Sequence, residues 1–439
     1  MEGRCRPRGP QSFLYAGALP GSLLLCLFLA TGCGDATGDT PDTEQAAASV
    51  RPGIQVLLRD SLHLVRDRRV GLITNHTGLV PSRERPGDPA AARSSIDVLA
   101  EAPQVELVAL FGPEHGIRGD AEAGERVESG MDPRTGVPIH SLYGATRRPS
   151  PESLDGVEVL VFDMQDVGAR FYTYVSTMAY AMEAAGAAGI PFVVVDRPNP
   201  IRGDVVQGNV LDPSFATFVG LYPVPMRHGM TVGELARMIV GEFGVEVELH
   251  VVPMDGWDPT SVWAATELPW VAPSPNLPSV ASALAYPGTC LFEGTPLSVG
   301  RGTEQAFQWV GAPWLDGAAL AEAMNGYGID GVRFEAVRFT PENPGDGKFG
   351  GVEVQGVRFV SESTDYDAPR AAVALLVEAR VASGDRWSWN QAHFDRLAGT
   401  DSLRLGLEAG LGLEELTAGW PAQQAAFKAR RAPYLLYRD

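Results

Sequence analysis

The stretch VEVLVFDMQD (157–166) runs through mainly apolar residues and then turns at once to acidic and amide side chains. An alanine-rich stretch without proline follows from Tyr172 to Ala188, and after it comes the apolar run PFVVV (191–195). Short apolar runs are typical of strands buried on both faces, and a proline-free stretch of this length suits a crossover helix. The three segments together predict two parallel strands joined by a helix.

Two earlier runs, VGLIT (70–74) and VELVALF (105–111), have the same character. The string TVGE (231–234) resembles a capping box, in which a threonine and a following glutamate open a helix. This alternation predicts an α/β fold, a Rossmann-like, doubly wound and mostly parallel sheet. We place this domain at residues 51–285.

The later part of the chain has a different pattern. The strings VRFEAVRF (332–339) and VEVQGVRF (352–359) alternate with a period of two, and helical stretches follow from Ala368 onward. We therefore expect a smaller α+β domain at residues 286–439 that contributes to the active-site cleft. The proline-rich segment LPWVAPSPNLP (268–278) lies between the two patterns and is expected to form a hinge or one wall of an interdomain cleft.

The N-terminal segment has the pattern of a signal peptide. Arg4, Arg6 and Arg8 precede an apolar run at residues 22–30, which is too short to span a membrane comfortably. We expect residues 1–32 to be removed from an exported protein, and we leave them out of the fold.

The end of this segment, LATGC (29–33), resembles a bacterial lipobox. In a lipobox the cysteine thiol carries lipid and the peptide is cut just before it. Ala30 stands where leucine is usual, so simple secretion is the alternative. We expect Cys33 to be lipidated and residues 33–50 to form a flexible tether, which would anchor the protein to a membrane facing the periplasm or the cell exterior.

The composition and net charge restrict the classes of molecule that the protein can bind. The 439 residues are 45% hydrophobic and 20% charged, as in a soluble globular protein. The formal net charge of −19 argues against nucleic acid as a partner, because phosphate binding needs basic faces. An anionic ligand must therefore meet locally placed arginines. After loss of the signal peptide only Cys33 and Cys290 remain, and we expect Cys290 to be a buried thiol.

Polar residues follow each of the four apolar runs. Ligands of parallel sheets collect outside the carboxyl ends of the strands, so these residues are the candidates for a site. Any one of them alone is ordinary loop polarity, whereas four together favour a site. They are NHTG (75–78), EH (114–115), DMQD (163–166) and DRPN (196–199).

Several familiar sites are missing from the sequence. The loop TNHTG (74–78) replaces the glycine-rich loop of a dinucleotide fold, and there is no phosphate loop, serine-nucleophile elbow or HExxH zinc motif. We therefore expect no cofactor. A zinc site is the weaker alternative, because its ligands have no tight spacing. Its members would be His76, His115, His140 and His228 with Asp163 or Asp166.

Six strings in fixed order resemble the bacterial exo-β-N-acetylmuramidases, long catalogued as a domain of unknown function. The resemblance spans from about Ile54 to the C-terminus, and it implies a Rossmann-like domain, a smaller C-terminal domain and release of terminal N-acetylmuramic acid from the non-reducing end of peptidoglycan fragments. The strings are GLITNHTG (71–78), LFGPEHGIRGD (110–120), VFDMQDVGARFYTY (161–174), VDRPNP (195–200), PMRHGMTVGELA (225–236) and YPGTCLFEGTPLSVGRGT (286–303).

Glycosidic cleavage without a cofactor needs a carboxylic acid that protonates the leaving oxygen. Glu114 is the leading candidate because it follows an apolar strand. Partial desolvation there would raise its pKa toward the working pH, as a general acid requires. Its ordinary alternative is a helix-capping or salt-bridged glutamate. His115 is interpreted as a group that orients Glu114 or the sugar.

The second catalytic group is open among three possibilities. Glu293 would approach from the smaller domain, whereas Asp166 lies on the same strand rim as Glu114. The third possibility is the substrate's own 2-acetamido group, with one protein carboxylate orienting it. We favour Glu293.

Binding residues follow from the chemistry of the sugar. The lactyl carboxylate of N-acetylmuramic acid calls for arginine, whose planar fork holds a carboxylate, although surface ion pairing is equally ordinary. The amides suit hydroxyl or acetamido groups, and Tyr172 suits a sugar face. The predicted binding residues are Asn75, His76, His115, Arg118, Gln165, Arg170, Tyr172, Arg227, His228, Asn276 and Arg301. Two other classes remain, a metal-dependent hydrolase and a lipoprotein that binds wall fragments without cutting them.

Overall fold

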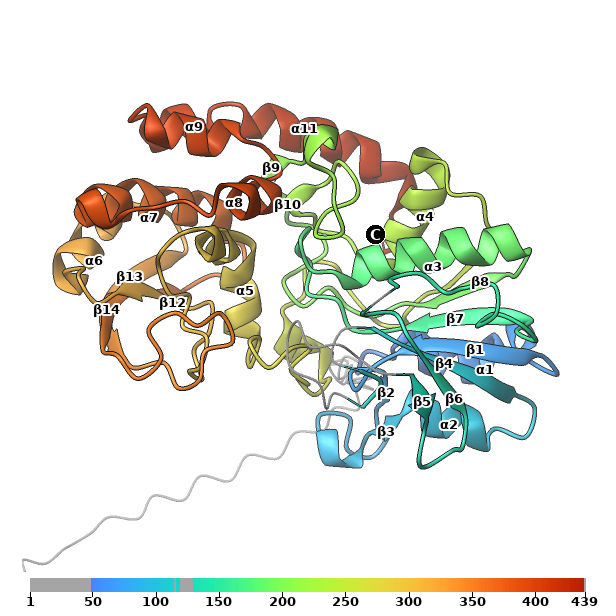
Figure 1. The fold of residues 1–439 in the computed structure, drawn as a ribbon. Coiled ribbons are helices and arrows are strands. Elements are labelled where there is room, and N and C mark those ends of the chain that lie inside the picture. The colour runs from blue at the N-terminus through green and yellow to red at the C-terminus, as the bar shows by residue number, and fades with distance from the viewer. Residues whose placement is uncertain (1–48, 114–115, 119–128, 145, 438–439) are drawn as a thin grey trace, which may run out of the picture. The chain divides into compact units, whose positions relative to one another are not determined.

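The structure is a computed structural model that describes residues 49–113, 116–118, 129–144 and 146–437 (Figure 1). Glu114, His115 and Cys33 lie outside the described residues, as do the predicted signal peptide and most of the predicted tether. In the described part of the chain, no helix has the length and apolar character needed to cross a membrane.

A seven-stranded sheet forms the first part of the fold, and all its neighbouring strands are parallel except the edge pair β5 and β6. Its order is β11-β8-β7-β1-β4-β6-β5. The strands are β1 (Arg69–Thr74), β4 (Glu106–Gly112), β5 (Gly130–Met131), β6 (Pro138–Ser141), β7 (Val159–Asp163), β8 (Phe192–Val195) and β11 (Leu249–Val252).

The strand order reverses beside β1. The chain adds β4 and β6 on one side of β1, and then returns to add β7, β8 and β11 on the other side. Thr74 at the end of β1 lies opposite Asp163 at the end of β7. In an open parallel sheet the crevice for a ligand lies at such a reversal, outside the carboxyl ends of the strands.

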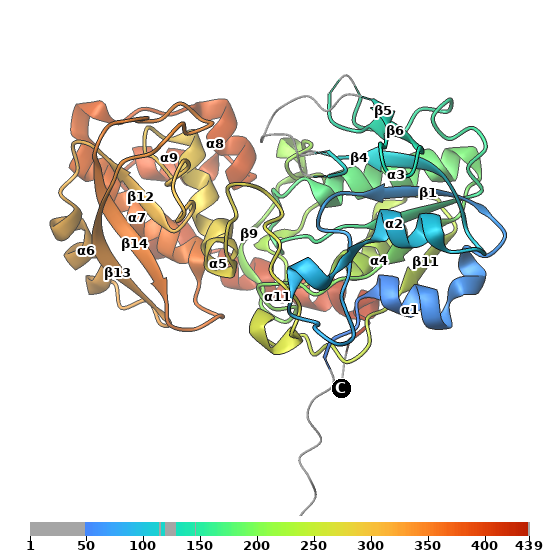
Figure 2. The ribbon, with the colours of Figure 1, turned by 90° about the horizontal axis from the view of Figure 1, so that it is seen from below.

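Helices cover both faces of this sheet (Figures 1 and 2). Leu160 and Phe162 of β7 join the core under α3 (Tyr174–Ala188) and α4 (Val232–Phe243), whereas the alternate residues Val159 and Val161 join the core under α1 (Gly53–Asp60) and α2 (Ser95–Glu101). Full burial of such an aliphatic or aromatic side chain stabilises the folded state by roughly 1.5–3 kcal/mol relative to leaving it exposed to water. The predicted doubly wound sheet is confirmed.

Helix α4 begins with the predicted capping box. The Thr231 hydroxyl accepts a hydrogen bond from the Glu234 backbone N–H at 3.2 Å, and Oε2 of Glu234 accepts one from the Thr231 N–H at 2.9 Å. Two of the helix's otherwise unpaired donors are satisfied in this way. Gly244 ends the helix in the left-handed conformation, with a φ of 77°.

The later part of the chain contains a three-stranded antiparallel sheet in the order β12-β14-β13. Its strands are β12 (Trp309–Ala312), β13 (Val332–Phe339) and β14 (Val354–Ser361). The strand predicted at 332–339 is confirmed, and the one predicted at 352–359 begins two residues later because Val352 and Glu353 are exposed loop residues.

Helices α5 (Val280–Thr289) and α6 (Gly317–Gly326) pack against this smaller sheet, as expected for an α+β arrangement, and further helices and a few short strands complete the fold. The further helices are α7 (Ala368–Ser383), α8 (Gln391–Ala398), α9 (Ser402–Glu408), α10 (Leu413–Thr417) and α11 (Trp420–Arg431). The short strands are β2 (Leu79–Val80), β3 (Arg93–Ser94), β9 (Gln207–Val210) and β10 (Pro225–Arg227). The predicted boundary at residues 285 and 286 falls inside α5 and stays a prediction.

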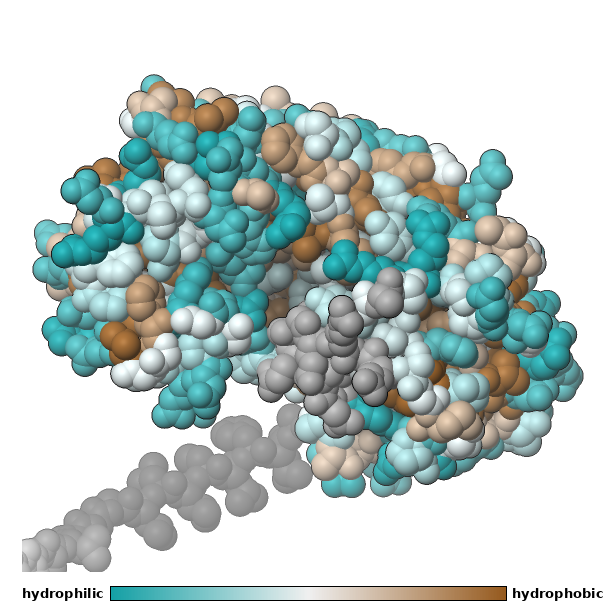
Figure 3. All heavy atoms as spheres, viewed as in Figure 1, coloured by the Kyte–Doolittle hydropathy of each residue, from teal (hydrophilic) through white to brown (hydrophobic). Residues whose placement is uncertain are grey.

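The end of the chain returns to the first sheet. The Tyr437 hydroxyl donates to Asp196 Oδ2 at 2.7 Å, and the Leu436 N–H donates to Glu234 Oε1 at 2.8 Å. Burial raises the pKa of Asp196 to about 6 and that of Glu234 to about 7. Two buried acids therefore anchor the last residues of the chain. The face of the molecule shown in Figure 3 is largely hydrophilic, with small scattered apolar patches.

Candidate active site

The strand ends at the reversal of the sheet are tied together by Thr77. Its hydroxyl accepts a hydrogen bond from the Gln165 N–H at 3.0 Å and donates to Asn75 Oδ1 at 2.6 Å. The Asn75 side chain in turn donates to the Tyr174 hydroxyl at 2.6 Å. The structure therefore brings together Asn75 and Gln165, two of the predicted binding residues, at the crevice that the strand order creates.

The proline-rich segment crosses the same strand ends. The ring Nε2 of His76 lies 2.8 Å from the Ala272 carbonyl. The hydroxyls of Tyr172 and Tyr174 both donate to the Pro273 carbonyl, at 2.9 and 2.8 Å. Asn276 stands three residues further along this segment and lines a groove in the later part of the chain. His76 and Tyr172 thus lie at the strand ends, as the sequence predicts.

Asp166 faces His228 in the interior. Asp166 Oδ2 accepts from the Gly168 N–H at 2.7 Å and lies 3.7 Å from His228 Nε2. The Met230 N–H donates to His228 Nδ1, which leaves the ring proton on Nε2, toward the carboxylate. Asp166 Oδ1 is buried without a hydrogen-bond partner among the described residues. Several other buried polar atoms among the described residues also have no partner, so this state is not specific to Asp166.

Glu293 forms an ion pair with Arg301. Arg301 donates Nε–H to Glu293 Oε1 at 2.8 Å and donates to the same oxygen through Nη2. The second carboxylate oxygen of Glu293 lies 3.7 Å from Cys290 Sγ and 4.0 Å from His393 Nε2. Burial and, after it, the charge of Glu293 raise the pKa of the Cys290 thiol well above its ordinary value. Cys290 is a buried free cysteine, so the predicted buried thiol is confirmed.

Aromatic rings join the strand rim to the Glu293–Arg301 pair. Tyr172 lies edge-on to Tyr174 at 4.7 Å between ring centroids, and edge-on to Tyr286 at 6.1 Å. Tyr286 packs on Phe307 at 4.7 Å, and the Arg301 guanidinium lies 5.4 Å from the centre of the same Phe307 ring. The residues predicted on the two parts of the chain therefore belong to one continuous cluster.

Arg170 and Arg227 have surroundings that do not support their predicted substrate contacts. Both are buried, and burial lowers the pKa of Arg170 to about 9 and that of Arg227 to about 10. Arg170 donates to four backbone carbonyls at 2.8 to 3.2 Å, which belong to Asn209, Val224, Leu397 and Ala398. Arg227 donates to Gln207 Oε1 at 3.0 Å and to the carbonyls of Ile201 and Thr364. Through these contacts Arg170 and Arg227 hold separate loops of the protein together.

Arg118 also has protein partners. It pairs with Asp132, whose carboxylate is fully buried, at 2.9 Å, and with Asp97 at 3.0 Å. Its contacts thus fasten the segment after β4 to α2. Among the residues that the structure describes, Arg301 is the one of the four predicted arginines that lies beside a candidate catalytic carboxylate, that of Glu293.

The zinc alternative finds no support in the geometry. Among the residues that the structure describes, no group of three or more His, Cys, Asp or Glu side chains is arranged to hold a metal ion. Asp163, one of its proposed ligands, instead accepts a hydrogen bond from Arg197 Nε at 2.6 Å.

Tyr174, Tyr286, Phe307 and Lys348 contact this cluster and were not predicted as site residues from the sequence, and Thr77 was named only as part of the string NHTG (75–78). Thr77, Tyr174 and Tyr286 stand inside the family-like strings, so those strings carried a signal for them. Lys348 carried none, because it stands in a glycine-rich loop. Its ammonium donates to the carbonyls of Leu297, Phe292 and Glu293 at 2.9, 3.1 and 3.3 Å.

Comparisons with known proteins find relatives over most of the chain. Residues 70–281 match the family described as Exo-beta-N-acetylmuramidase NamZ, N-terminal, and residues 284–437 match its C-terminal counterpart. The peptidoglycan beta-N-acetylmuramidase NamZ of Bacillus subtilis (strain 168) is 42% identical over 407 residues, which cover 92% of this chain and 95% of that protein.

Two crystal structures of DUF1343 family proteins from Bacteroides fragilis are similar in fold. The first has a TM-score of 0.80 and 34% identity, and the match covers 89% of this chain and 100% of that one. The second has a TM-score of 0.69 and 32% identity, and the match covers 89% of this chain and 99% of that one.

Proposed function

The chain belongs to the exo-beta-N-acetylmuramidase NamZ family and is a glycoside hydrolase, and on this premise we propose how its residues release terminal N-acetylmuramic acid from the non-reducing end of peptidoglycan fragments. The observation that carries the proposal is the continuous cluster from the strand rim to the Glu293–Arg301 pair. It links amide, hydroxyl, carboxylate and guanidinium groups through packed aromatic rings, and these are the kinds of group that bind a charged amino sugar.

Glu114 is proposed as the general acid that protonates the glycosidic oxygen. The support is its place in the sequence, two residues after the end of β4 at Gly112. β4 is the neighbour of β1, with Phe111 opposite Ile73, so the chain leaves the sheet beside the crevice. Acid assistance to the leaving oxygen is the step that a cofactor-free glycosidase needs.

Glu293 is proposed as the second catalytic group. Its side chain is 16% exposed, so a substrate can reach it, and Arg301 fixes the orientation of its carboxylate. A carboxylate held by a guanidinium is suited to stabilise an oxocarbenium-like centre or to attack it. Asp166, with its unpaired buried oxygen, is the alternative, acting directly or by orienting the substrate's acetamido group.

Arg301 is proposed to meet the lactyl carboxylate as well. Arg170 and Arg227 are occupied by carbonyl groups, whereas the Arg301 side chain is 17% exposed and uses Nε and Nη2 for Glu293. A guanidinium has five N–H donors, so Arg301 can bind both carboxylates.

Export and lipid anchoring are also proposed, with Cys33 as the lipidated residue. The support is the sequence pattern of three arginines, an apolar run and LATGC (29–33). In a bacterial host grown with labelled palmitate, the full-length chain should incorporate label and Cys33→Ser should not. Equal labelling of both forms would contradict the assignment.

One digest tests the enzymatic proposal. Purified full-length protein should release free N-acetylmuramic acid from a MurNAc-GlcNAc disaccharide, and a chelator should leave the rate unchanged. Glu114→Gln should lose turnover and retain binding, while Glu152→Gln, an exposed control, should keep both.

Three outcomes would contradict the proposal. Product that disappears with chelator would favour a metal-dependent hydrolase. Tight binding without product in the unchanged protein would favour a wall-fragment binder. Full turnover in Glu114→Gln would remove Glu114 from the acid role.

A further inference from the structure

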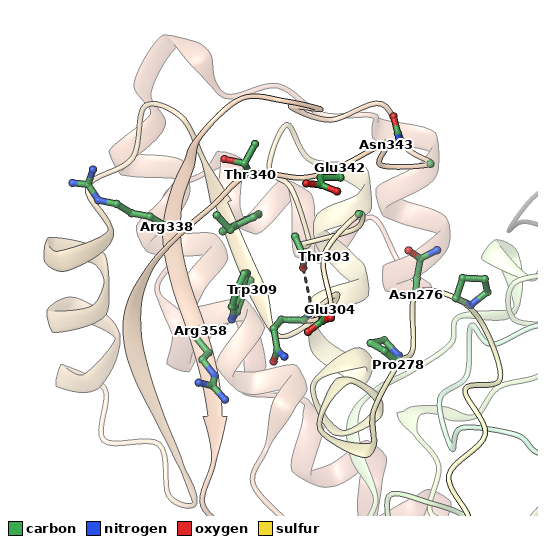
Figure 4. Close-up of a pocket in the computed structure, with 15 residues that line it drawn as sticks. Asn276, Pro278, Thr303, Glu304, Trp309, Arg338, Thr340, Glu342, Asn343 and Arg358 are labelled. Carbon is green, nitrogen blue, oxygen red and sulfur yellow. Dashed lines mark hydrogen bonds between the residues drawn. The ribbon is translucent and has the colours of Figure 1, made fainter. Parts of the chain in front are cut away.

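A large groove lies in the later part of the chain (Figure 4). Its walls come from residues 275–278, 302–309 and 338–345, together with Arg358 of β14, and we call it the C-terminal groove. Its volume is about 1390 Å³. Pockets for small molecules commonly measure about 300–1,000 Å³, so this groove is suited to an extended ligand.

Two lining residues of the C-terminal groove stand close in sequence to residues of the candidate active site. Asn276 lines the groove and stands three residues after Pro273, whose carbonyl accepts hydrogen bonds from the hydroxyls of Tyr172 and Tyr174. Gly302, also in the lining, directly follows Arg301, the partner of Glu293. The chain therefore continues directly from the Glu293–Arg301 pair into a wall of the groove.

The lining has the chemistry of a carbohydrate site. Trp309 lies partly buried at the centre of the view, with its ring 5.2 Å from that of Phe339 (Figure 4). Such a ring offers an apolar platform for the C–H face of a sugar. The remaining polar lining consists of the amides Asn276, Gln305 and Asn343, the hydroxyls Thr303 and Thr340, and the charged residues Glu304, Glu342, Arg338 and Arg358.

The charges of this lining balance, with two glutamates against two arginines. Such a lining offers guanidinium groups to the lactyl carboxylates of N-acetylmuramic acid units, and it offers amide, hydroxyl and carboxylate groups to the hydroxyl and acetamido groups of a glycan. Arg338 and Arg358 also have protein partners, because their guanidinium groups lie 3.3 Å from Glu353 and 3.8 Å from Glu335.

The far wall of the groove is fastened to the turn that carries Glu293. This wall includes Glu342 and Asn343, and Lys348 of the same loop donates to the Glu293 carbonyl and to two neighbouring ones. The Glu342 N–H donates to the Gly302 carbonyl at 2.9 Å. Gly302 has a φ of 77°, and a Cβ there would overlap the Glu342 carbonyl, so the two walls meet only because this residue is glycine.

We propose that the C-terminal groove binds the reducing-side sugars of a peptidoglycan glycan, the part of the substrate that remains after the terminal N-acetylmuramic acid is cut off. This assignment rests on the proposed function. An enzyme that removes the terminal sugar from the non-reducing end needs room for one sugar on that side, and all further sugars extend from the leaving-group side. The groove is suited to that side because one of its walls continues directly from Arg301, the partner of Glu293.

The test compares chain lengths. The substrates are 4-nitrophenyl β-N-acetylmuraminide, the MurNAc-GlcNAc disaccharide and a hexasaccharide with the same non-reducing end. In the unchanged protein kcat/KM should rise with chain length. Trp309→Ala should lower kcat/KM on the hexasaccharide by about 3- to 10-fold, the size of one lost aromatic contact, and leave the nitrophenyl substrate unchanged.

Three further variants keep the test decisive if Trp309→Ala folds poorly. Trp309→Phe should retain much of the hexasaccharide rate. Thr340→Trp places a bulky side chain at an exposed position of the groove and should lower the hexasaccharide rate alone. Ser388→Trp, exposed and outside the groove lining, is the matched control and should change nothing.

The groove assignment is overturned if kcat/KM does not depend on chain length, or if the groove variants affect all three substrates equally. It is also overturned if the variants act only on substrates with stem peptides, which would assign the groove to peptide. Absence of hydrolysis of every substrate by the unchanged protein is a different result, because it overturns the proposed function itself and the groove assignment with it.

Discussion

The Thr77 hydroxyl accepts a hydrogen bond from the backbone N–H of Gln165 at 3.0 Å, across the two strands between which the sheet order reverses. Because both residues are buried, this bond sets the separation of the two loops that carry Asn75 and Asp166. The crevice thus has a fixed width at its base, and the side chains around it are preorganised.

Replacing Thr77 by valine should weaken both the fold and the reaction. The valine keeps the shape but leaves the Gln165 N–H without its acceptor, at a cost of about 1–3 kcal/mol in the free energy of unfolding. Urea unfolding and kcat/KM on the disaccharide measure the two effects. Thr77→Ser keeps the hydroxyl and should retain most of both. A serine variant as impaired as the valine variant would show that the methyl group, rather than the hydrogen bond, matters.

Glu293→Gln should reduce kcat by about 100- to 10,000-fold, the range expected when a catalytic carboxylate is lost. Asp166→Asn should cost less, since in this assignment Asp166 only helps to orient the sugar. Steady-state kinetics of the two variants on the nitrophenyl substrate compare them directly. The reverse order of losses would assign the second catalytic role to Asp166.

Lys348→Met should misplace Glu293 without touching substrate. The methionine removes the ammonium that holds three carbonyls of the Glu293 turn. We expect kcat to fall about tenfold at a temperature where the variant is fully folded, with a changed pH profile of kcat. Lys348→Arg keeps a charged donor and should recover part of the rate. An unchanged pH profile with a lower melting temperature would indicate a purely structural role.

The stability of the fold should depend on pH through Asp196 and Glu234. Burial raises the pKa of Asp196 to about 6 and that of Glu234 to about 7, so the native state holds protons that the unfolded chain releases. Their stabilising contribution is complete below about pH 4 and is lost as pH rises through 6 and 7. The loss is of the order of 3 kcal/mol for each group.

Urea unfolding at pH 5 and pH 8 measures this contribution. The double variant Asp196→Asn, Glu234→Gln should lose less unfolding free energy between the two pH values than the unchanged protein does. Asp255→Asn, at an exposed ion pair with Arg51, is the control and should behave like the unchanged protein. Identical pH dependence in all three would contradict the role of the buried acids.

Much of the sheet could be predicted because its strands are buried on both faces. The apolar runs that became β1, β4, β7 and β8 are visible without any knowledge of their neighbours. The strand β6, with the sequence PIHS, is only partly buried and has no such pattern. Its place in the sheet follows from pairing with β4, which the local sequence does not record.

The candidate site could be predicted in its location and less well in its contacts. The rule that ligands collect at the carboxyl ends of strands brought Asn75 and Gln165 together correctly. The partners of Arg170 could not be predicted, because Leu397 and Ala398 lie far along the chain and offer only backbone carbonyls, which any sequence has. Charge alone does not distinguish an arginine that binds substrate from one that holds loops.

Both ends of the folded body contact the residues that come just after strand β11. Arg51 exchanges backbone hydrogen bonds with Asp255 at 2.9 and 3.0 Å, and the Tyr437 hydroxyl accepts one from the neighbouring Met254 N–H at 2.9 Å. The first and last described segments of the folded body therefore lie side by side. A domain fused after Tyr437 would emerge close to Arg51, and a circular permutant that joins these two segments would need only a short linker.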